Sequence, residues 1–132
     1  MDTSIWTLRM LSILRIMSSL LLMEHGTQKL LGFPPAEWQP ELLSLLGFAG
    51  VLEMFGGFLL LIGLFTRPAA FVLSGFAAAA YFIGHASKSF FPMLNDGDAA
   101  ILYCFVFLYL VFAGGGAWSL DAWRRRAASS AA

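Results

Sequence analysis

Four apolar stretches separated by turn-rich breaks dominate the pattern of hydrophobic and polar positions along the chain. We expect membrane-spanning helices over roughly 5–31, 42–64, 68–88 and 99–117. The first three are near or above the ~20 residues that a helix needs to cross ~30 Å of hydrocarbon, and the last is slightly short unless it continues toward Trp123. The pattern predicts an all-α fold, an integral membrane four-helix bundle that forms one transmembrane domain over residues 1–132.

Each break contains residues that end or begin a helix. The Gly-Phe-Pro-Pro run at 32–35 stops the first stretch, because proline lacks a backbone donor and restricts the residue before it. Thr66-Arg67-Pro68 places a proline in a first helical turn, and the Asn-Asp-Gly-Asp run at 95–98 supplies turn residues and an N-cap for the fourth helix. Arg15 interrupts the first apolar stretch and no cleavage site follows, so we expect a mature helix there, not a signal peptide.

Composition supports a membrane protein and excludes two other classes. The chain is 59% hydrophobic and 12% charged with a mean hydropathy of +0.77, whereas about a quarter of the residues in a soluble domain are charged. A net charge of zero leaves no basic surface for nucleic acid, so we expect membrane lipid and no nucleic acid as a partner. Cys104 is the only cysteine, which excludes an internal disulfide and a Cys-x-x-C redox pair.

The placement of basic residues in the short loops predicts the orientation. Five of them fall on one side and two on the other, so we expect both termini in the cytoplasm. These residues are Arg9, Arg67, Arg124, Arg125 and Arg126 on the first side, and Lys29 and Lys88 on the second. Trp118 and Trp123 would then lie at the inner lipid–water boundary.

Charged groups inside the apolar stretches are the strongest functional signal. A buried ionised side chain needs a partner or a function, and Arg15, Glu24 and Glu53 lie within stretches long enough to span a membrane. On the second predicted helix Glu53 shares a face with Gly50 and Gly57, residues small enough to let another helix approach closely. On the first helix the polar residues fall within an arc of roughly 140°. They are Ser12, Arg15, Ser18, Ser19, His25 and Lys29.

The other two helices carry comparable stripes. Ser74, Tyr81, His85 and Lys88 line up on the third helix, and Asp98, Phe105, Tyr109 and Phe112 on the fourth. We expect all four stripes to face the interior. Glu24 projects opposite Arg15 and would face another partner.

Within that interior we predict an ion pair between Arg15 and Glu53, with His85 as a competing partner for Glu53. The pair would either fix helix register or also contact a ligand or proton path. The candidate catalytic residues are Glu53 and Arg15. The candidate ligand-binding residues are His25, Lys29, His85, Tyr81 and Tyr109. His25 and Lys29 could instead extend toward lipid headgroups, and the aromatic stripe could be core packing.

No metal site is expected. Two histidines toward the outer end, His25 and His85, raise bis-histidine haem ligation as a minor alternative. The Glu-x-x-His pairs of di-iron bundles are absent, since Glu24 and His25 are adjacent and point about 100° apart. No phosphate loop, nucleophile elbow or zinc spacing is present.

The order of several short motifs resembles the DoxX family of small four-helix membrane proteins. These motifs are Arg15 followed by His25-Gly26 and Lys29-Leu30, then Glu53 leading into Gly56-Gly57, then the run from Gly63 to Ala70, and finally Gly114-Gly115-Gly116 before Trp118-Ser119-Leu120-Asp121. The resemblance implies a multi-pass protein of the bacterial inner (cytoplasmic) membrane, linked to respiratory or sulfur-redox modules such as quinone-reducing thiosulfate oxidoreductases.

Three functions remain open from the sequence. The first is a quinone-binding subunit of a membrane redox complex without a redox centre of its own, so that a redox partner protein or membrane complex supplies the electrons. The second is a non-enzymatic scaffold whose glycine faces dock on a larger complex or on another copy as a homo-oligomer. The third is a solute or proton carrier, which the lack of an inverted repeat disfavours. Whether the protein is an enzyme is left undecided.

Overall fold

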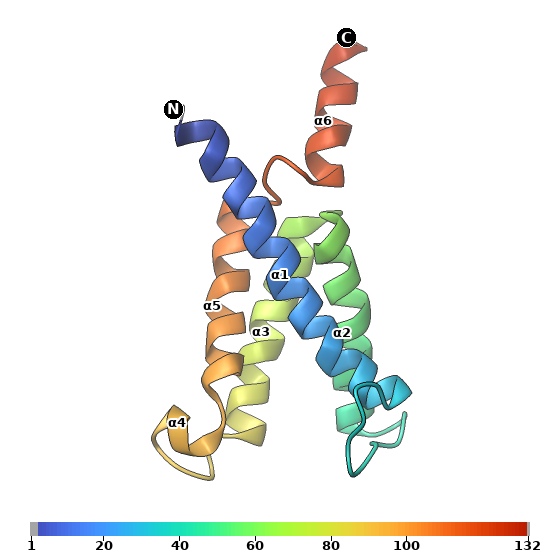
Figure 1. The fold of residues 1–132 in the computed structure, drawn as a ribbon, viewed down its shortest axis with the longest axis vertical. Helices are drawn as coiled ribbons and strands as arrows, with labels where there is room; N and C mark the ends of the chain where they lie inside the picture. The colour runs from blue at the N-terminus through green and yellow to red at the C-terminus, as the bar shows by residue number, and fades with distance from the viewer. Residues whose placement is uncertain (1–2, 132) are drawn as a thin grey trace.

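The computed structural model describes residues 3–131 and contains only helices in that range (Figure 1). The elements are α1 (Thr3–Leu31), α2 (Leu45–Ile62), α3 (Thr66–Gly84), α4 (Pro92–Asn95), α5 (Asp98–Ala113) and α6 (Leu120–Ser130). Helix α1 packs along α2, and α3 packs along α5, so the bundle consists of two helix pairs. Both ends of the chain lie at one end of the bundle, from which α6 projects, and α4 lies in the loop at the opposite end.

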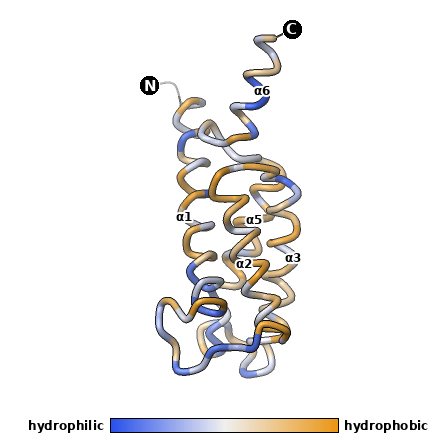
Figure 2. The backbone as a smooth tube through the Cα atoms, turned by 90° about the vertical axis from the view of Figure 1, so that its right-hand side faces the viewer, coloured by the Kyte–Doolittle hydropathy of each residue, from blue (hydrophilic) through white to orange (hydrophobic). Residues whose placement is uncertain are grey.

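Helix lengths agree with a membrane protein. Within the described residues α1, α2 and α3 are long and apolar enough to cross a membrane, while α5 is a shorter apolar helix of 16 residues, or about 24 Å. Only 33%, 28% and 22% of the most apolar windows of α1, α2 and α3 are buried within the chain. Many large apolar side chains of these helices are exposed, as expected for contact with lipid. Figure 2 shows that apolar residues predominate along the helices.

A helix lies in each of the four predicted stretches, three of them long enough to span a membrane, and several ends differ from the prediction. The fourth stops at Ala113 instead of 117, because Gly114 adopts a φ of 81° and turns the chain away. The second begins at Leu45 instead of 42, after Ser44, whose hydroxyl caps it by accepting from the Gly47 N–H. The third ends at Gly84 instead of 88. The short helices α4 and α6 were not predicted.

Glycines allow α1 and α2 to cross at close range. A Cβ atom added at Gly26 would lie 2.8 Å from the Met54 backbone nitrogen, and one added at Gly50 would lie 2.9 Å from the Lys29 Cβ. One added at Gly57 would lie 2.6 Å from the Met23 Cγ. The glycine face of the second helix is thus used for packing inside this chain.

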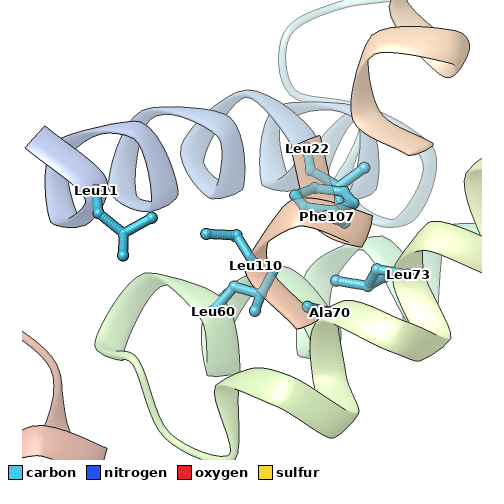
Figure 3. Packing of buried hydrophobic residues seen from close by; sticks show 7 residues of the cluster. All are labelled: Leu11, Leu22, Leu60, Ala70, Leu73, Phe107 and Leu110. Carbon is cyan, nitrogen blue, oxygen red and sulfur yellow. The ribbon is translucent and has the colours of Figure 1, made fainter. Parts of the chain in front are cut away.

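The core joins the two helix pairs. Its buried apolar side chains come from α1, α2, α3 and α5 and meet in one cluster (Figure 3). They are Leu11, Leu22, Leu60, Ala70, Leu73, Phe107 and Leu110.

Charge is distributed unevenly between the two halves of the bundle. The half nearest the chain ends holds six arginines and, among residues 3–131, one acid. They are Arg9, Arg15, Arg67, Arg124, Arg125 and Arg126, with Asp121. The other half holds two lysines and six acids, namely Lys29 and Lys88 with Glu24, Glu37, Glu41, Glu53, Asp96 and Asp98. This asymmetry favours a fixed orientation across a membrane.

Candidate functional site

An ion pair between α1 and α2 lies at the centre of the candidate site. The Nζ atom of Lys29 donates to both carboxylate oxygens of Glu53, at 2.6 and 2.7 Å. The side chains are 23% and 7% exposed, respectively. Gly50 lies one turn before Glu53 and lets the Lys29 backbone approach α2, which brings the two groups together. The predicted pairing of Glu53 with Arg15 is therefore wrong, because Lys29 occupies that carboxylate.

A cavity of about 630 Å³ adjoins this pair, between the α1–α2 pair and the α3–α5 pair in the half of the bundle away from the chain ends. Its polar lining consists of His25, Lys29, Glu53, His85, Asp96 and Tyr103. Apolar side chains of α2 and α3, including Leu52 and Phe76, form most of the remaining wall. The cavity thus combines a polar end with apolar sides, which is typical of small-molecule sites.

The cavity opens outward between α2 and α3. Phe48 of α2 and Val72 and Ile83 of α3 line it and are each more than half exposed on the apolar outer surface. Gly75 lies on the same wall, and a Cβ atom added there would meet nothing within 4 Å. An apolar molecule dissolved in lipid could therefore enter from the side.

The aromatic side chain that α5 contributes to the cavity is Tyr103, which the sequence analysis missed. Its ring lies edge-on to the His25 ring, at 6.2 Å between centroids, and stacks on Phe107 at 5.6 Å. Tyr103, Phe107 and Leu110 recur at helical spacing, but the stripe containing Phe105 and Tyr109 does so equally well, so the sequence held no signal that separates the two faces of α5.

The predicted stripe of α5 faces outward instead. Phe105, Tyr109 and Phe112 are each more than half exposed, and none lines the cavity. The predicted interior position of Tyr109 is therefore wrong. Asp98 at the start of α5 is also exposed and outside the cavity lining.

His85 and Tyr81 hold the loop beside the cavity. His85 Nδ1 lies 2.9 Å from the Asn95 carbonyl oxygen, so this histidine does not pair with Glu53. The Tyr81 hydroxyl accepts from the amide of Asn95, at 3.2 Å, and the same amide donates to the Ser89 carbonyl, at 2.9 Å. His85 lines the cavity, whereas Tyr81 does not. Glu24, expected to project opposite Arg15 toward another partner, is exposed.

Arg15 lies in the opposite half of the bundle, fully buried, and binds backbone carbonyls. Its guanidinium donates to Leu60 and Leu61 at the C-terminus of α2, to Gly115 at 2.8 Å and to Trp118 at 2.6 Å. A helix C-terminus carries partial negative charge and unpaired carbonyls, so a fork-shaped cation satisfies it well. Arg15 joins α1 to the end of α2 and to the loop before α6, away from the cavity.

Two more charged residues cap helices at the same end. Arg67 donates to the carbonyls of Val111 and Phe112, at 3.0 and 2.9 Å, at the end of α5. The Asp121 carboxylate accepts from the backbone N–H groups of Phe65 and Thr66, at 3.0 and 2.8 Å, at the start of α3. Partial burial acts to raise the pKa of Asp121, but the hydrogen bonds from Thr66 and Phe65 and the charge of Arg125 outweigh it and leave the pKa below its usual value.

These contacts explain why distant sequence motifs occur together. The run from Gly63 to Ala70 and the segment from Gly114 to Asp121 meet at this end, where Arg15 links them. Comparison with known proteins agrees with the motifs from Arg15 to Ala70, since the DoxX family model matches residues 10–86, and the segment from Gly114 to Asp121 lies outside that match. The chain belongs to the DoxX family. The match includes Arg15, Lys29, Glu53 and His85, so the resemblance inferred from the sequence is confirmed.

One relative of this DoxX protein comes from Haemophilus influenzae and carries the description "Uncharacterized protein". It is 46% identical over 121 residues, and the alignment covers 84% of this chain and 87% of the relative. No solved structure matches the chain significantly.

The polar groups of this DoxX protein offer hydrogen bonding beside an apolar cavity. Among residues 3–131 no group of three or more His, Cys, Asp or Glu side chains could hold a metal ion. The Lys29 ammonium has three N–H donors, of which the Glu53 carboxylate engages two, so one remains for a ligand. The exposed imidazole of His25 adds ring nitrogens that can donate or accept a hydrogen bond at the polar end of the cavity.

Proposed function

We propose that this DoxX protein is a multi-pass subunit of the bacterial cytoplasmic membrane that binds a quinone in the cavity beside Lys29 and Glu53 and serves respiratory or sulfur redox chemistry. The observation that carries the proposal is the polar end of that cavity, formed by His25, Lys29, Glu53 and His85, next to apolar walls that open between α2 and α3. A quinone has the matching construction, with two carbonyl oxygens on a flat ring and an apolar tail.

Size and access support this ligand class. The cavity of about 630 Å³ lies within the range of roughly 300–1,000 Å³ that is common for small-molecule sites. With the ring inside, the tail would pass between Phe48 and Val72 into lipid. The Tyr103 ring would lie along the quinone ring as an aromatic wall, a role for which the sequence had suggested the outward-facing Tyr109.

The residues would have distinct roles. Lys29 and His25 would donate hydrogen bonds to a quinone carbonyl, and Glu53 would hold or pass a proton when the quinone is reduced. Reduction to the quinol takes two electrons and two protons, and the chain carries one cysteine, so the electrons would come from a redox partner protein or membrane complex. Arg15 takes no part in this scheme, because its donors are occupied by carbonyls far from the cavity.

The test is a titration of the purified protein with ubiquinone and menaquinone analogues. Saturable binding is expected in the wild type, with binding weakened at least tenfold in Gly75→Leu, which fills the cavity and leaves every charged group intact. Gly75→Ala adds one methyl group and serves as the graded control. Phe82→Leu, on the outward surface of the same helix, is the second control. Absence of saturable binding, or equal affinity in wild type and Gly75→Leu, would remove the proposal.

A non-enzymatic scaffold or assembly subunit remains the second candidate. The glycine face of α2, which suggested such docking from the sequence, packs against α1 within this chain. The observation that still favours it is the outward aromatic row of Phe105, Tyr109 and Phe112, which a larger membrane complex or another copy could cover. Native mass in mild detergent would distinguish the two, since the scaffold predicts a stable complex and function that persists in Gly75→Leu.

A further inference from the structure

A basic groove lies at the end of the bundle where α6 leaves it, distant from the quinone cavity. Its walls are the start of α3, the loop after α5 and α6 itself. Figure 1 shows these segments at the same end of the bundle. Four arginines line it, Arg67, Arg124, Arg125 and Arg126, together with the single acid Asp121.

The charge of this groove is not neutralised within the chain. Arg67 is occupied by the carbonyls at the end of α5, and Asp121 by the N–H groups at the start of α3. Among the described residues the only ion pair within 4.0 Å is the one between Lys29 and Glu53. The guanidinium of Arg124 lies 5.7 Å from the centre of the Phe65 ring, and no carboxylate pairs directly with Arg125 or Arg126. Arg124, Arg125 and Arg126 thus face the groove, and the one carboxylate nearby, Asp121, is hydrogen-bonded to α3.

The groove also lies at the level expected for lipid headgroups. Asp121 fixes the first turn of α6 to the end of α2, through a hydrogen bond from its N–H to the Gly63 carbonyl at 2.9 Å, and to the start of α3. The three arginines follow within about 5–8 Å along α6. Phe65 and Trp123 line the same groove and are 56% and 61% exposed. Aromatic rings beside cations are typical of a lipid–water boundary.

We infer that this groove binds the headgroup of an anionic phospholipid, with its phosphate against Arg124, Arg125 and Arg126 and its upper acyl chains against Phe65 and Trp123. Charge complementarity selects an anion, and the exposed aromatic rings select a lipid over a soluble phosphate. The inference does not depend on the quinone proposal, since the two sites share no residue.

The test is to delipidate the purified full chain, titrate it with phosphatidylglycerol or phosphatidylcholine, and count bound lipids by native mass spectrometry. Wild type should prefer phosphatidylglycerol. An arginine near an anionic surface strengthens the attraction by about fivefold, so R124Q/R125Q/R126Q should weaken binding by roughly a hundredfold. R124K/R125K/R126K keeps the charge and should retain most of the affinity for phosphatidylglycerol. Arg9→Gln, at the same end but outside the groove, should change affinity no more than about fivefold.

Three results would overturn the inference. These are equal binding of the two lipids, unchanged phosphatidylglycerol binding in the glutamine variant, and displacement of the lipid by millimolar inorganic phosphate, which would assign the groove to free phosphate. The thermal midpoint of each variant is measured in parallel. If the glutamine variant is unfolded, the comparison of the lysine variant with Arg9→Gln decides, because loss of binding in the lysine variant would contradict a charge-based site.

Discussion

The Lys29 ammonium lies between the two carboxylate oxygens of Glu53, at 2.6 and 2.7 Å, and joins α1 to α2 in the interior of the bundle. Removing one partner leaves the other charge buried without compensation, which costs more than the pair contributes. Lys29→Met should therefore destabilise the protein by about 3–5 kcal/mol, because it leaves the Glu53 carboxylate alone.

The double variant Lys29→Met/Glu53→Leu should recover most of this loss, since apolar replacements of similar volume remove both desolvation costs. The measurement is the thermal midpoint of the three proteins in one detergent. A double variant less stable than Lys29→Met would contradict the isolated-pair interpretation and point to a further partner for Glu53.

Arg15 should not be replaceable by lysine. Its planar fork donates to four carbonyls on two segments, and a lysine ammonium has three donors without the geometry to reach both. A hydrogen bond to a charged group is worth about 1.5–3 kcal/mol, so Arg15→Lys should lose at least about 2 kcal/mol and Arg15→Met more. The control is Arg9→Lys, since Arg9 stacks on Trp6 at the surface of the same helix. Quinone-analogue affinity in folded Arg15→Lys should stay unchanged.

The sequence revealed which faces of α1 and α2 are buried but not their partners. Ser12, Arg15 and Ser19 are fully buried and Glu53 nearly so, because isolated polar groups in apolar helices mark the protein-facing side. The partner of Arg15 could not be found from side-chain pairing, since it binds carbonyls that every residue carries. Backbone carbonyls are free to accept hydrogen bonds from a side chain only at a helix end. Where the end of α2 lies relative to α1 depends on tertiary packing.

The inward face of α5 was missed for a different reason. This helix is apolar around its whole circumference, so periodicity gives no preferred face. Two stripes, one containing Tyr103 and Phe107 and the other Phe105 and Tyr109, fit the spacing equally well. Packing against α3 decides between them, with Ser74 donating to the Cys104 carbonyl at 2.8 Å and the Phe107 side chain buried in the core.

Acid should weaken the cap that Asp121 forms on α3. The pKa of Asp121 is lower in the folded protein than in the unfolded chain. The ionised carboxylate therefore stabilises the folded state at pH values above the unfolded pKa, and this stabilisation is lost as the pH falls through the folded pKa. The free energy of unfolding should therefore be about 1 kcal/mol higher for wild type than for Asp121→Asn at neutral pH, because the amide offers one acceptor oxygen where the carboxylate accepts two N–H bonds. The difference should begin to shrink below about pH 5 and largely disappear well below about pH 4.

The check on this cap is a set of thermal melts of both proteins between pH 3 and 7. Asp96→Asn is the matched control, because Asp96 is exposed at the other end of the bundle and accepts no backbone N–H of α3. A stability gap that stays constant with pH would mean that the carboxylate charge is not what stabilises the start of α3.

Two glycine-to-alanine changes should have opposite effects. In Gly26→Ala the new methyl group would lie 2.8 Å from the Met54 backbone nitrogen and 3.0 Å from the Gly50 carbonyl oxygen, so α1 and α2 must move apart at the cost of about 1–3 kcal/mol. In Gly75→Ala the methyl group enters open space, and the gain in helix propensity should leave stability unchanged or higher by up to about 1 kcal/mol.

Because the separation of α1 from α2 also sets the Lys29–Glu53 distance, Gly26→Ala should weaken quinone-analogue binding while Gly75→Ala changes it little. Thermal midpoints and analogue titrations on the same samples measure both effects. A destabilised Gly75→Ala would show that the space beside Gly75 on α3 is filled by other atoms and not open.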